Sequence, residues 1–150
     1  MTRMNRKLEY ALMALKHMSL KVPGQLTSAK EVVSTTGVPF DATARVMQQM
    51  AQQGLLRAEH GAHGGYSIVK DLSKVSFFDL HEMILGPLDI VKCIQATTEC
   101  DLSNTCNIQS PLTNLSRRLS DFYRGVTLAE LLRIKETTRV SNMSAEAGPQ

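Results

Sequence analysis

The stretch "LLRAEHGAHGGYSIVK", residues 55–70, decides the fold. Two short strand-like runs, 55–59 and 66–69, flank a turn that contains three glycines, and this pattern predicts a β-hairpin. The turn could instead be a phosphate-binding enzyme loop, but it lacks the Gly-Lys-Ser/Thr ending of a nucleotide P-loop, and no helix opens directly after it. We therefore interpret the stretch as an exposed two-stranded hairpin.

Three helices are predicted upstream of the hairpin, over residues 5–20, 28–37 and about 41–53. Their apolar residues recur at helical spacing, and the second helix opens on a capping box formed by Ser28 and Glu31. Three helices followed by a two-stranded hairpin is the element order of a winged helix–turn–helix. In that fold the third helix enters the DNA major groove and the hairpin, or wing, reaches along the backbone. The predicted fold class is therefore mainly α with a small β-hairpin.

The third predicted helix has one apolar side and one polar side, and the polar side is rich in arginine and glutamine. Both residue types can bond a base edge through two hydrogen bonds. Polar helix faces are more often simply solvated, but the place of this one between a capped short helix and a Gly-rich hairpin favours DNA reading. The two hairpin histidines could contact phosphates, although such surface histidines are often idle. The candidate DNA-contacting residues are Ser28, Pro39, Asp41, Thr43, Arg45, Gln48, Gln49, Arg57, His60 and His63.

The charge distribution agrees with a polyanionic partner. Residues 1–57 carry eight basic and three acidic side chains, a net charge of +5, whereas the whole chain has only +3. A length of 150 residues suits one domain, or one domain plus an arm, and 43% apolar residues is ordinary for a globular protein. Neither a signal peptide nor a membrane-spanning stretch is recognisable, so we expect a reducing cytoplasm and no membrane partner.

Downstream of the hairpin, the sequence predicts a fourth helix, a polar loop, a long helix and a short last helix. The fourth helix, "FFDLHEMIL", is ended by a Gly-Pro pair at 86–87. Pro111 opens the long helix, which carries an apolar stripe. The last helix is expected over 128–132, and from about Glu136 no apolar pattern continues.

All three cysteines lie within "CIQATTECDLSNTC", residues 93–106, with the spacing Cys-x6-Cys-x5-Cys. Crowding on a polar loop fits buried structural thiols poorly, and an odd number of cysteines in a reducing compartment argues against disulfides. A metal site is the remaining interpretation. The tight two-cysteine knuckle of zinc sites is absent, whereas soft thiolates suit iron–sulfur clusters, which usually take four protein ligands. The loop therefore lacks one ligand.

Several segments together resemble the Rrf2 family of bacterial winged-helix regulators. They are "LEYALMAL" in the first helix, the hairpin stretch, "VSFFDLHEMILGP" after it, and a cysteine triad before a long helix that closes on "VTLAELL". The resemblance covers roughly residues 1–132. It implies a homodimer joined through the long helix, a palindromic operator in double-stranded DNA, and one [2Fe–2S] or [4Fe–4S] cluster per subunit.

The resemblance also assigns residues to the cluster. Cys93, Cys100 and Cys106 fall on the three cluster cysteines of the family. Some members use a histidine shortly after the third cysteine, where this chain offers only Gln109. Others use a carboxylate from the first helix of the partner subunit, and the residue at that place is Glu9, which could also be a plain acid near a helix N-terminus.

The wing departs from the family pattern at one position. Relatives often carry an arginine before the Gly-rich turn, and this chain has His60 there. The expected organisation is a winged helix–turn–helix domain at 1–86, a cysteine-rich cluster-binding loop at 87–109, a dimerisation helix and closing helix at 110–135, and a flexible tail at 136–150.

These expectations describe a DNA-binding transcriptional regulator, expected to be a repressor, that senses redox state, nitric oxide or iron and cluster status. We expect no enzyme, because the sequence has no nucleophile elbow, no Walker loop and no paired carboxylates near a histidine. An enzyme with a low-pKa cysteine would need a basic neighbour, and only Lys92 is close in sequence. The alternative is a cluster-free thiol- or zinc-based regulator of the same fold.

Overall fold

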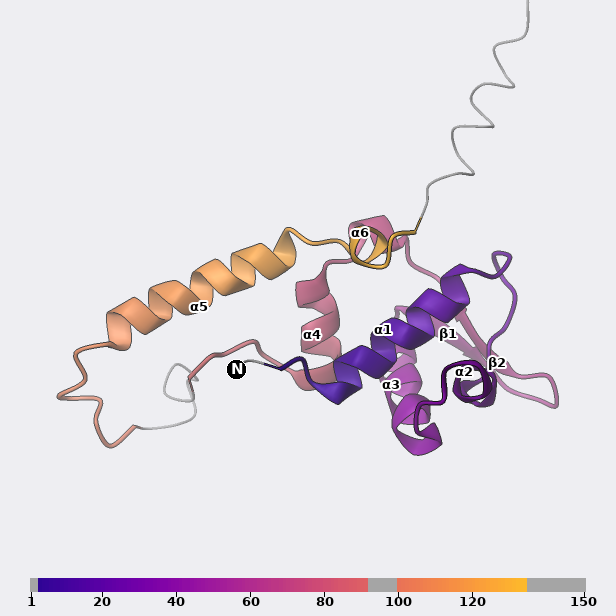
Figure 1. Cartoon of the computed structure of the whole chain (residues 1–150), viewed down its shortest axis with the longest axis horizontal. Helices are drawn as coiled ribbons and strands as arrows, with labels where there is room; N and C mark the ends of the chain where they lie inside the picture. Colours follow the sequence, from indigo (N-terminus) through magenta and orange to yellow (C-terminus); the bar gives the residue numbers. More distant parts are fainter. Residues whose placement is uncertain (1–2, 92–99, 135–150) are drawn as a thin grey trace, which may run out of the picture.

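The computed structural model describes residues 3–91 and 100–134 of the chain. Figure 1 shows α1 to α4 and the hairpin gathered into one body, with α5 extending to one side. This arrangement confirms the predicted mainly helical fold with one small hairpin, while the tail predicted at 136–150 lies outside the described residues. The elements are α1 (Arg6–Ser19), α2 (Ala29–Thr36), α3 (Phe40–Gln52), β1 (Leu56–Glu59), β2 (Gly65–Ile68), the 3-10 helix η1 (Leu72–Lys74), α4 (Phe77–Leu85), α5 (Gln109–Arg124) and α6 (Leu128–Leu131).

The core of this body lies between α1, α3 and α4. Its side chains come from the apolar stripes that the helical spacing predicted, because residues three and four apart share one face of a helix. Burial of these stripes is the main stabilising contribution to such a fold. The largest fully buried apolar side chains are Leu15, Met47, Met50, Leu55, Leu80 and Leu128.

The ends of α2 are set by side-chain and backbone caps. The Ser28 hydroxyl accepts a hydrogen bond from the Glu31 amide at 3.2 Å, and Gly37 ends the helix at a φ of 75°, which glycine adopts without strain. The Glu31 carboxylate, however, contacts Lys21 Nζ and lies 3.3 Å from His17 Nε2. The predicted capping box is therefore only half formed, and Glu31 instead ties α2 to the end of α1.

The hairpin is fixed to the loop that precedes α2. Its strands are antiparallel, with Leu56 opposite Ile68 and Glu59 opposite Gly65. The Thr27 and Tyr66 amides each donate to the other residue's carbonyl at 2.8 Å. A Cβ atom on Gly65 would lie 2.9 Å from the Thr27 carbonyl carbon, so only glycine allows this approach.

After α5, the chain returns to the body. The Leu128 amide donates to the Val75 carbonyl and the Phe77 amide to the Val126 carbonyl, both at 2.8 Å. Leu128 is fully buried, and Lys16 Nζ donates to the Leu132 carbonyl at 2.8 Å. The short last helix thus packs with the winged helix–turn–helix, although the sequence grouped it with the long helix.

The start of α5 also differs from the expectation. The helix begins at Gln109, and Pro111 lies within its first turn instead of at its opening. Proline fits there because amides of the first turn have no partner within the helix. In the described part of the chain, none of the helices has the length and apolar character needed to cross a membrane.

Candidate nucleic-acid interface and cysteine loop

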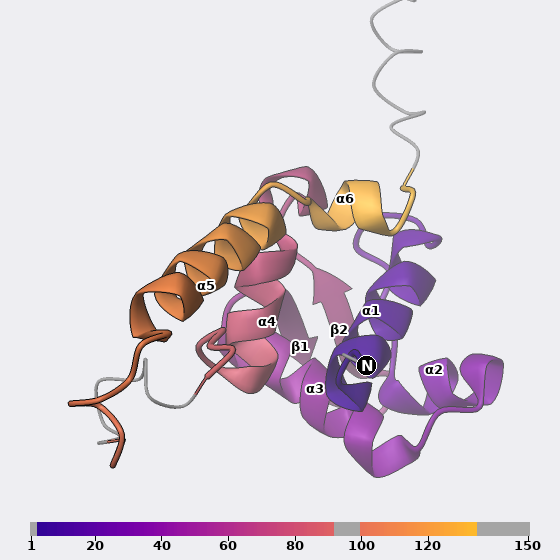
Figure 2. The same cartoon turned by 60° about the vertical axis from the view of Figure 1, so that its left-hand side comes forward.

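The surface of α3 carries most of the predicted DNA-contacting residues. Asp41, Arg45 and Gln48 are exposed, Gln49 is half-buried, and Pro39 is the exposed N-cap residue. Figures 1 and 2 both show α2 and α3 on the side of the body that faces away from α5. The polar side of α3 is therefore free to meet a partner without interference from the long helix.

Thr43 is the exception, and its predicted place on the polar side is wrong. Its side chain is 0% exposed, and its hydroxyl donates to the Pro39 carbonyl at 2.8 Å. The hydroxyl thereby has its hydrogen-bond partner within the helix, and Thr43 belongs to the buried side of α3 together with Val46 and Met47. Thr43 supports the start of α3 from within and does not face DNA.

A groove between α3 and the hairpin brings several polar side chains together. Gln48 and Gln52 from α3, Arg57 and His60 from β1 and its turn, and Tyr66 from β2 line a hollow of about 480 Å³. The sequence predicted Gln48, Arg57 and His60 as contacts but not the other two. The signal for Gln52 was available, since it lies four residues after Gln48 on the same helix face.

The two remaining predicted contacts, which lie outside α3, do not line this groove either. His63 is exposed in the hairpin turn. Ser28 is half-buried, and its hydroxyl is already engaged in capping α2. The candidate interface is therefore centred on the exposed side of α3 and the adjoining face of the hairpin.

The cysteine loop is described in part. Cys100 and Cys106 are half-buried free thiols, whereas Cys93 lies outside the described residues. Turns separate the two thiols: the Ser103 amide donates to the Cys100 carbonyl and the Thr105 amide to the Leu102 carbonyl, both at 3.0 Å. Two soft sulfur donors on a short polar loop suit the chemistry of cluster iron.

Glu9 lies on α1, away from this loop. Its carboxylate is half-buried and accepts a hydrogen bond from Arg6 Nη1 at 3.4 Å. Figure 2 shows residues 100–108 beyond the outer end of α5 and well apart from the N-terminal end of α1. Accordingly, no group of three cysteine, histidine or acidic residues that could hold a metal occurs within the described residues of one chain.

One side of α5 has no covering partner in the described chain. Ser116 is its only buried residue, while Leu115 is 54% exposed and Phe122 is exposed as well. Its C-terminal end rests on α4, where the Phe77 and Tyr123 rings meet edge to face at 4.7 Å. The helix is thus anchored at one end and presents an apolar surface along its length.

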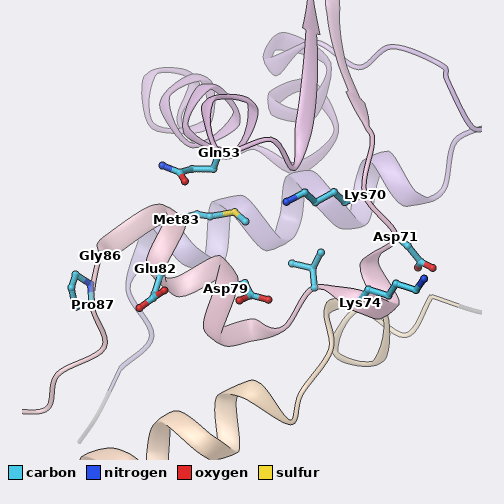
Figure 3. Close-up of a pocket in the computed structure, with 10 residues that line it drawn as sticks. Gln53, Lys70, Asp71, Lys74, Asp79, Glu82, Met83, Gly86 and Pro87 are labelled. Atoms are coloured by element: carbon cyan, nitrogen blue, oxygen red, sulfur yellow. The ribbon is translucent and has the colours of Figure 1, made fainter.

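A broad hollow of about 830 Å³ lies between the end of α3 and α4 (Figure 3). Its lining combines Lys70 and Lys74 with the acidic side chains of Asp71, Asp79 and Glu82, so it presents charges of both signs. Asp79 accepts from the Ser76 amide in the capping box of α4, and Asp71 accepts from the Ser73 amide to cap η1. These carboxylates already act as helix caps, and the side chains in Figure 3 spread around the hollow instead of converging on a point.

Comparison with known proteins places the chain in a family. The family model described as "Rrf2: Iron-dependent Transcriptional regulator" matches residues 4–134. The chain belongs to the Rrf2 family. Members of this family are DNA-binding transcriptional regulators and not enzymes, which agrees with the exposed polar side of α3 and the adjoining wing.

Three relatives illustrate the range of similarity. The HTH-type transcriptional regulator IscR of Yersinia pseudotuberculosis is 24% identical over 93% of this chain and 85% of its own length. CymR, described as the global cysteine regulator of B. subtilis, superposes with a TM-score of 0.67 at 17% identity, over 91% of this chain and 100% of its own. T. potens IscR gives 0.59 at 16% identity, over 99% and 93%. The two structures confirm the winged-helix fold of an Rrf2 regulator.

Proposed function

We propose that this Rrf2 protein works in the cytoplasm as a homodimeric repressor whose DNA affinity is controlled by an iron–sulfur cluster. The observation that carries the proposal is that two features occur in one chain. The polar side of α3 is exposed and suited to DNA, and the cysteine loop lies at the outer end of α5, whose apolar side is uncovered. The first feature provides a way to bind an operator and the second a way to sense a signal. The uncovered helix provides the means to join two subunits.

The DNA-binding half rests on exposed side chains that suit the major groove. Arg45 and Gln48 stand out from α3 and can each bond a base edge bidentately, while Arg57 on β1 is placed for a phosphate. Two subunits related by a two-fold axis would present two such helices, which matches a palindromic operator.

The sensing half rests on the donor chemistry of the loop. Cys93, Cys100 and Cys106 would hold the cluster, with Glu9 of the partner subunit as the fourth ligand. When bound, the cluster supplies an iron centre that is open to oxidation and to reactive small molecules. Cys100 and Cys106 are both half-buried and carry free thiols.

Ligation by a partner's Glu9 is compatible with its contacts in one chain. The Arg6–Glu9 pair is an exposed interaction between residues three apart, and such pairs contribute about 0.2–0.5 kcal/mol. That amount is too small to prevent the Glu9 carboxylate from binding iron instead. A bond between this residue and the other subunit's loop would couple the position of α1, and the body around it, to the state of the cluster. Cluster binding and DNA binding would then affect each other reciprocally.

The test is purification under strict exclusion of oxygen, followed by iron and sulfide analysis. Replacing Cys93, Cys100 or Cys106 singly with Ala should abolish iron and sulfide binding yet leave a folded dimer, because the buried core lies in other segments. Ser103→Ala, in the same loop, is the matched control and should keep both elements. Full iron and sulfide content in each cysteine variant would refute the ligand assignment.

Glu9 is tested by two substitutions in the same preparation. Glu9→Ala should make the cluster more labile, whereas Glu9→Cys should retain it with a slower reaction, since thiolate is a softer and stronger iron ligand than carboxylate. Unchanged spectra and unchanged DNA binding in Glu9→Ala would leave Glu9 as a plain acid near a helix end.

A cluster-free thiol regulator is the second candidate, and the free thiols of Cys100 and Cys106 favour it as an alternative. Such a protein would be colourless and free of sulfide after anaerobic purification. Its DNA affinity would still change on oxidation, and the cysteine variants would remove that response.

A further inference from the structure

The N-terminal end of α3 carries an exposed aromatic side chain that the DNA-binding proposal does not use. Phe40, the first residue of α3, is 52% exposed. Its neighbours in sequence, Pro39 and Asp41, are exposed as well. Single exposed apolar residues are common on protein surfaces, so exposure alone assigns no role to Phe40. Its position on the helix is the informative observation.

Phe40 shares a face of α3 with a candidate base-reading residue. In a helix of 3.6 residues per turn, residues eight apart lie within about 80° of each other around the axis, which places Phe40 and Gln48 on neighbouring parts of one side. Gln48 lines the groove between α3 and the hairpin. When a recognition helix lies in the major groove, its N-terminal residues contact base edges. Phe40 occupies that place.

The charge at this end of α3 also favours bases over the backbone. The carboxylate of Asp41 follows Phe40 directly and is exposed. Because phosphates are anionic, an acid at this point disfavours a close approach of the DNA backbone. A carboxylate can instead accept a hydrogen bond from the amino group of cytosine. The N-terminal end of α3 therefore combines an apolar group and an acceptor, both suited to pyrimidine edges in the major groove.

We propose that Phe40 reads the 5-methyl group of a thymine in each operator half-site, and that it determines specificity at that base pair. The thymine methyl is the apolar group that the major groove offers, and phenylalanine is among the side chains that contact it. This inference rests on the proposed role of α3 in reading DNA. It adds a contact that depends on apolar burial instead of hydrogen bonding.

The helix geometry also places the thymine. Phe40 and Gln48 are eight residues apart, which corresponds to roughly 12 Å along the helix axis at a rise of 1.5 Å per residue. At a spacing of about 3.4 Å per base pair, the thymine should lie no more than about three to four base pairs from the base read by Gln48, because an inclined helix covers less of the DNA axis.

The test uses a duplex that the full-length, anaerobically purified protein itself selects from a library with a randomised centre. Each thymine is then replaced in turn by deoxyuridine, which removes only the 5-methyl group. The parent should lose about fourfold in affinity when the methyl group under Phe40 is removed from one half-site, as expected for one buried apolar carbon. At the other thymines, replacement by deoxyuridine should change the affinity of the parent and of Phe40→Ala by the same factor.

The variants assign the effect to Phe40. Phe40→Ala should bind the thymine duplex about fourfold more weakly per half-site and show no further loss with deoxyuridine at that position, since the methyl partner is already gone. Phe40→Leu should keep the sensitivity to the methyl group. Leu20→Ala is the matched control, because Leu20 is also an exposed apolar residue but follows α1, and it should behave as the parent.

Two results overturn the inference. One is a parent protein that is insensitive to deoxyuridine at every position, and the other is an unchanged sensitivity in Phe40→Ala. Arg45→Ala and Gln48→Ala on the same duplex separate this failure from a failure of the proposed function. If these two variants lose discrimination while Phe40→Ala does not, α3 reads DNA without Phe40. If all three are neutral, α3 is not the reading helix.

Discussion

The winged helix–turn–helix body and the segment from the cysteine loop through α5 differ in how completely one chain stabilises them. The body buries a continuous apolar core drawn from α1, α2, α3, α4 and the returning α6. In α5, by contrast, only Ser116 is buried, and large apolar side chains remain exposed. One region has its stabilising contacts within the chain, and the other has an apolar surface that the described residues leave uncovered.

This difference explains how the two regions can serve different tasks. A densely packed body holds the side chains of α3 in a fixed arrangement, which base reading requires. A segment with few contacts of its own can change position at a small cost in free energy. Under the proposed function, a signal at the cysteine loop would therefore alter the relation between the two subunits while each body stays intact.

The largest expected effect is the loss of a core side chain. Leu15 is fully buried in α1, so Leu15→Ala should lower the free energy of unfolding by about 2–5 kcal/mol, through lost burial and the cavity left behind. Denaturant titration measures this loss, which should persist at all protein concentrations. Leu115→Ala, on α5, should cost far less, and this loss should disappear at low concentration, where the parent and the variant would both be monomeric. Equal losses in the two variants would remove the contrast between the regions.

The body was largely predictable from the sequence because its signals are local. Ser28 and Gly37 fix the ends of α2, and the Gly-rich turn fixes the hairpin, although its strands begin one residue away from the expected places. Thr43 is misplaced in a prediction from residue type alone, because threonine is polar. Its spacing from Val46 and Met47 already put it on the buried side, where its hydroxyl bonds to Pro39.

The remaining features depend on contacts between distant parts of the chain. No local pattern indicates that Leu128 enters the core, since the Leu128–Val75 hydrogen bond joins segments far apart in sequence. The same holds for Glu31. Its carboxylate contacts Lys21, after the end of α1, and therefore does not complete the expected capping box. The cysteine site can be predicted only as a donor set, because its proposed fourth ligand comes from another subunit.

A charge on the uncovered side of α5 should break the dimer. Leu115→Asp places a carboxylate on this apolar surface and should weaken dimerisation by about 2 kcal/mol or more, the scale of an interface hot spot. Sedimentation over a range of concentrations measures the change. Thr113→Asp, at an exposed position on the other side of the helix, is the control and should remain dimeric. A dimeric Leu115→Asp variant would show that α5 is not the interface.

The next effect concerns DNA reading by the rigid body. Arg45→Ala and Gln48→Ala should each reduce discrimination between operator and random DNA by about 1–3 kcal/mol if the contact is bidentate. Arg57→Ala should instead weaken binding to all sequences alike and reduce the slope of the salt dependence by about one. Binding titrations at several salt concentrations distinguish the two patterns. A sequence-independent loss in Arg45→Ala would reassign Arg45 to the phosphate backbone.

The smallest expected effect concerns the interaction of Glu31 with Lys21 and His17, which joins α2 to the end of α1. Lys21, followed by His17, lowers the pKa of Glu31 below its ordinary value of 4.5 by bonding to the charged carboxylate. A pKa that is lower in the folded state means that Glu31 contributes stability above pH 4.5 and loses this contribution as the pH falls through its folded-state pKa. Because the Glu31 side chain is 38% exposed, solvent screening limits the contribution to less than about 1 kcal/mol.

Glu31→Gln should therefore destabilise the protein slightly at neutral pH and not at all well below pH 4.5, where the parent carboxylate is protonated too. Denaturant titrations of both proteins at the two pH values measure the difference. Glu82→Gln, which changes an exposed acid on α4, controls for the loss of one negative charge. A difference between Glu31→Gln and the parent that persisted at low pH would mean that the Glu31 side chain contributes through packing. The tie between α1 and α2 would then not depend on charge.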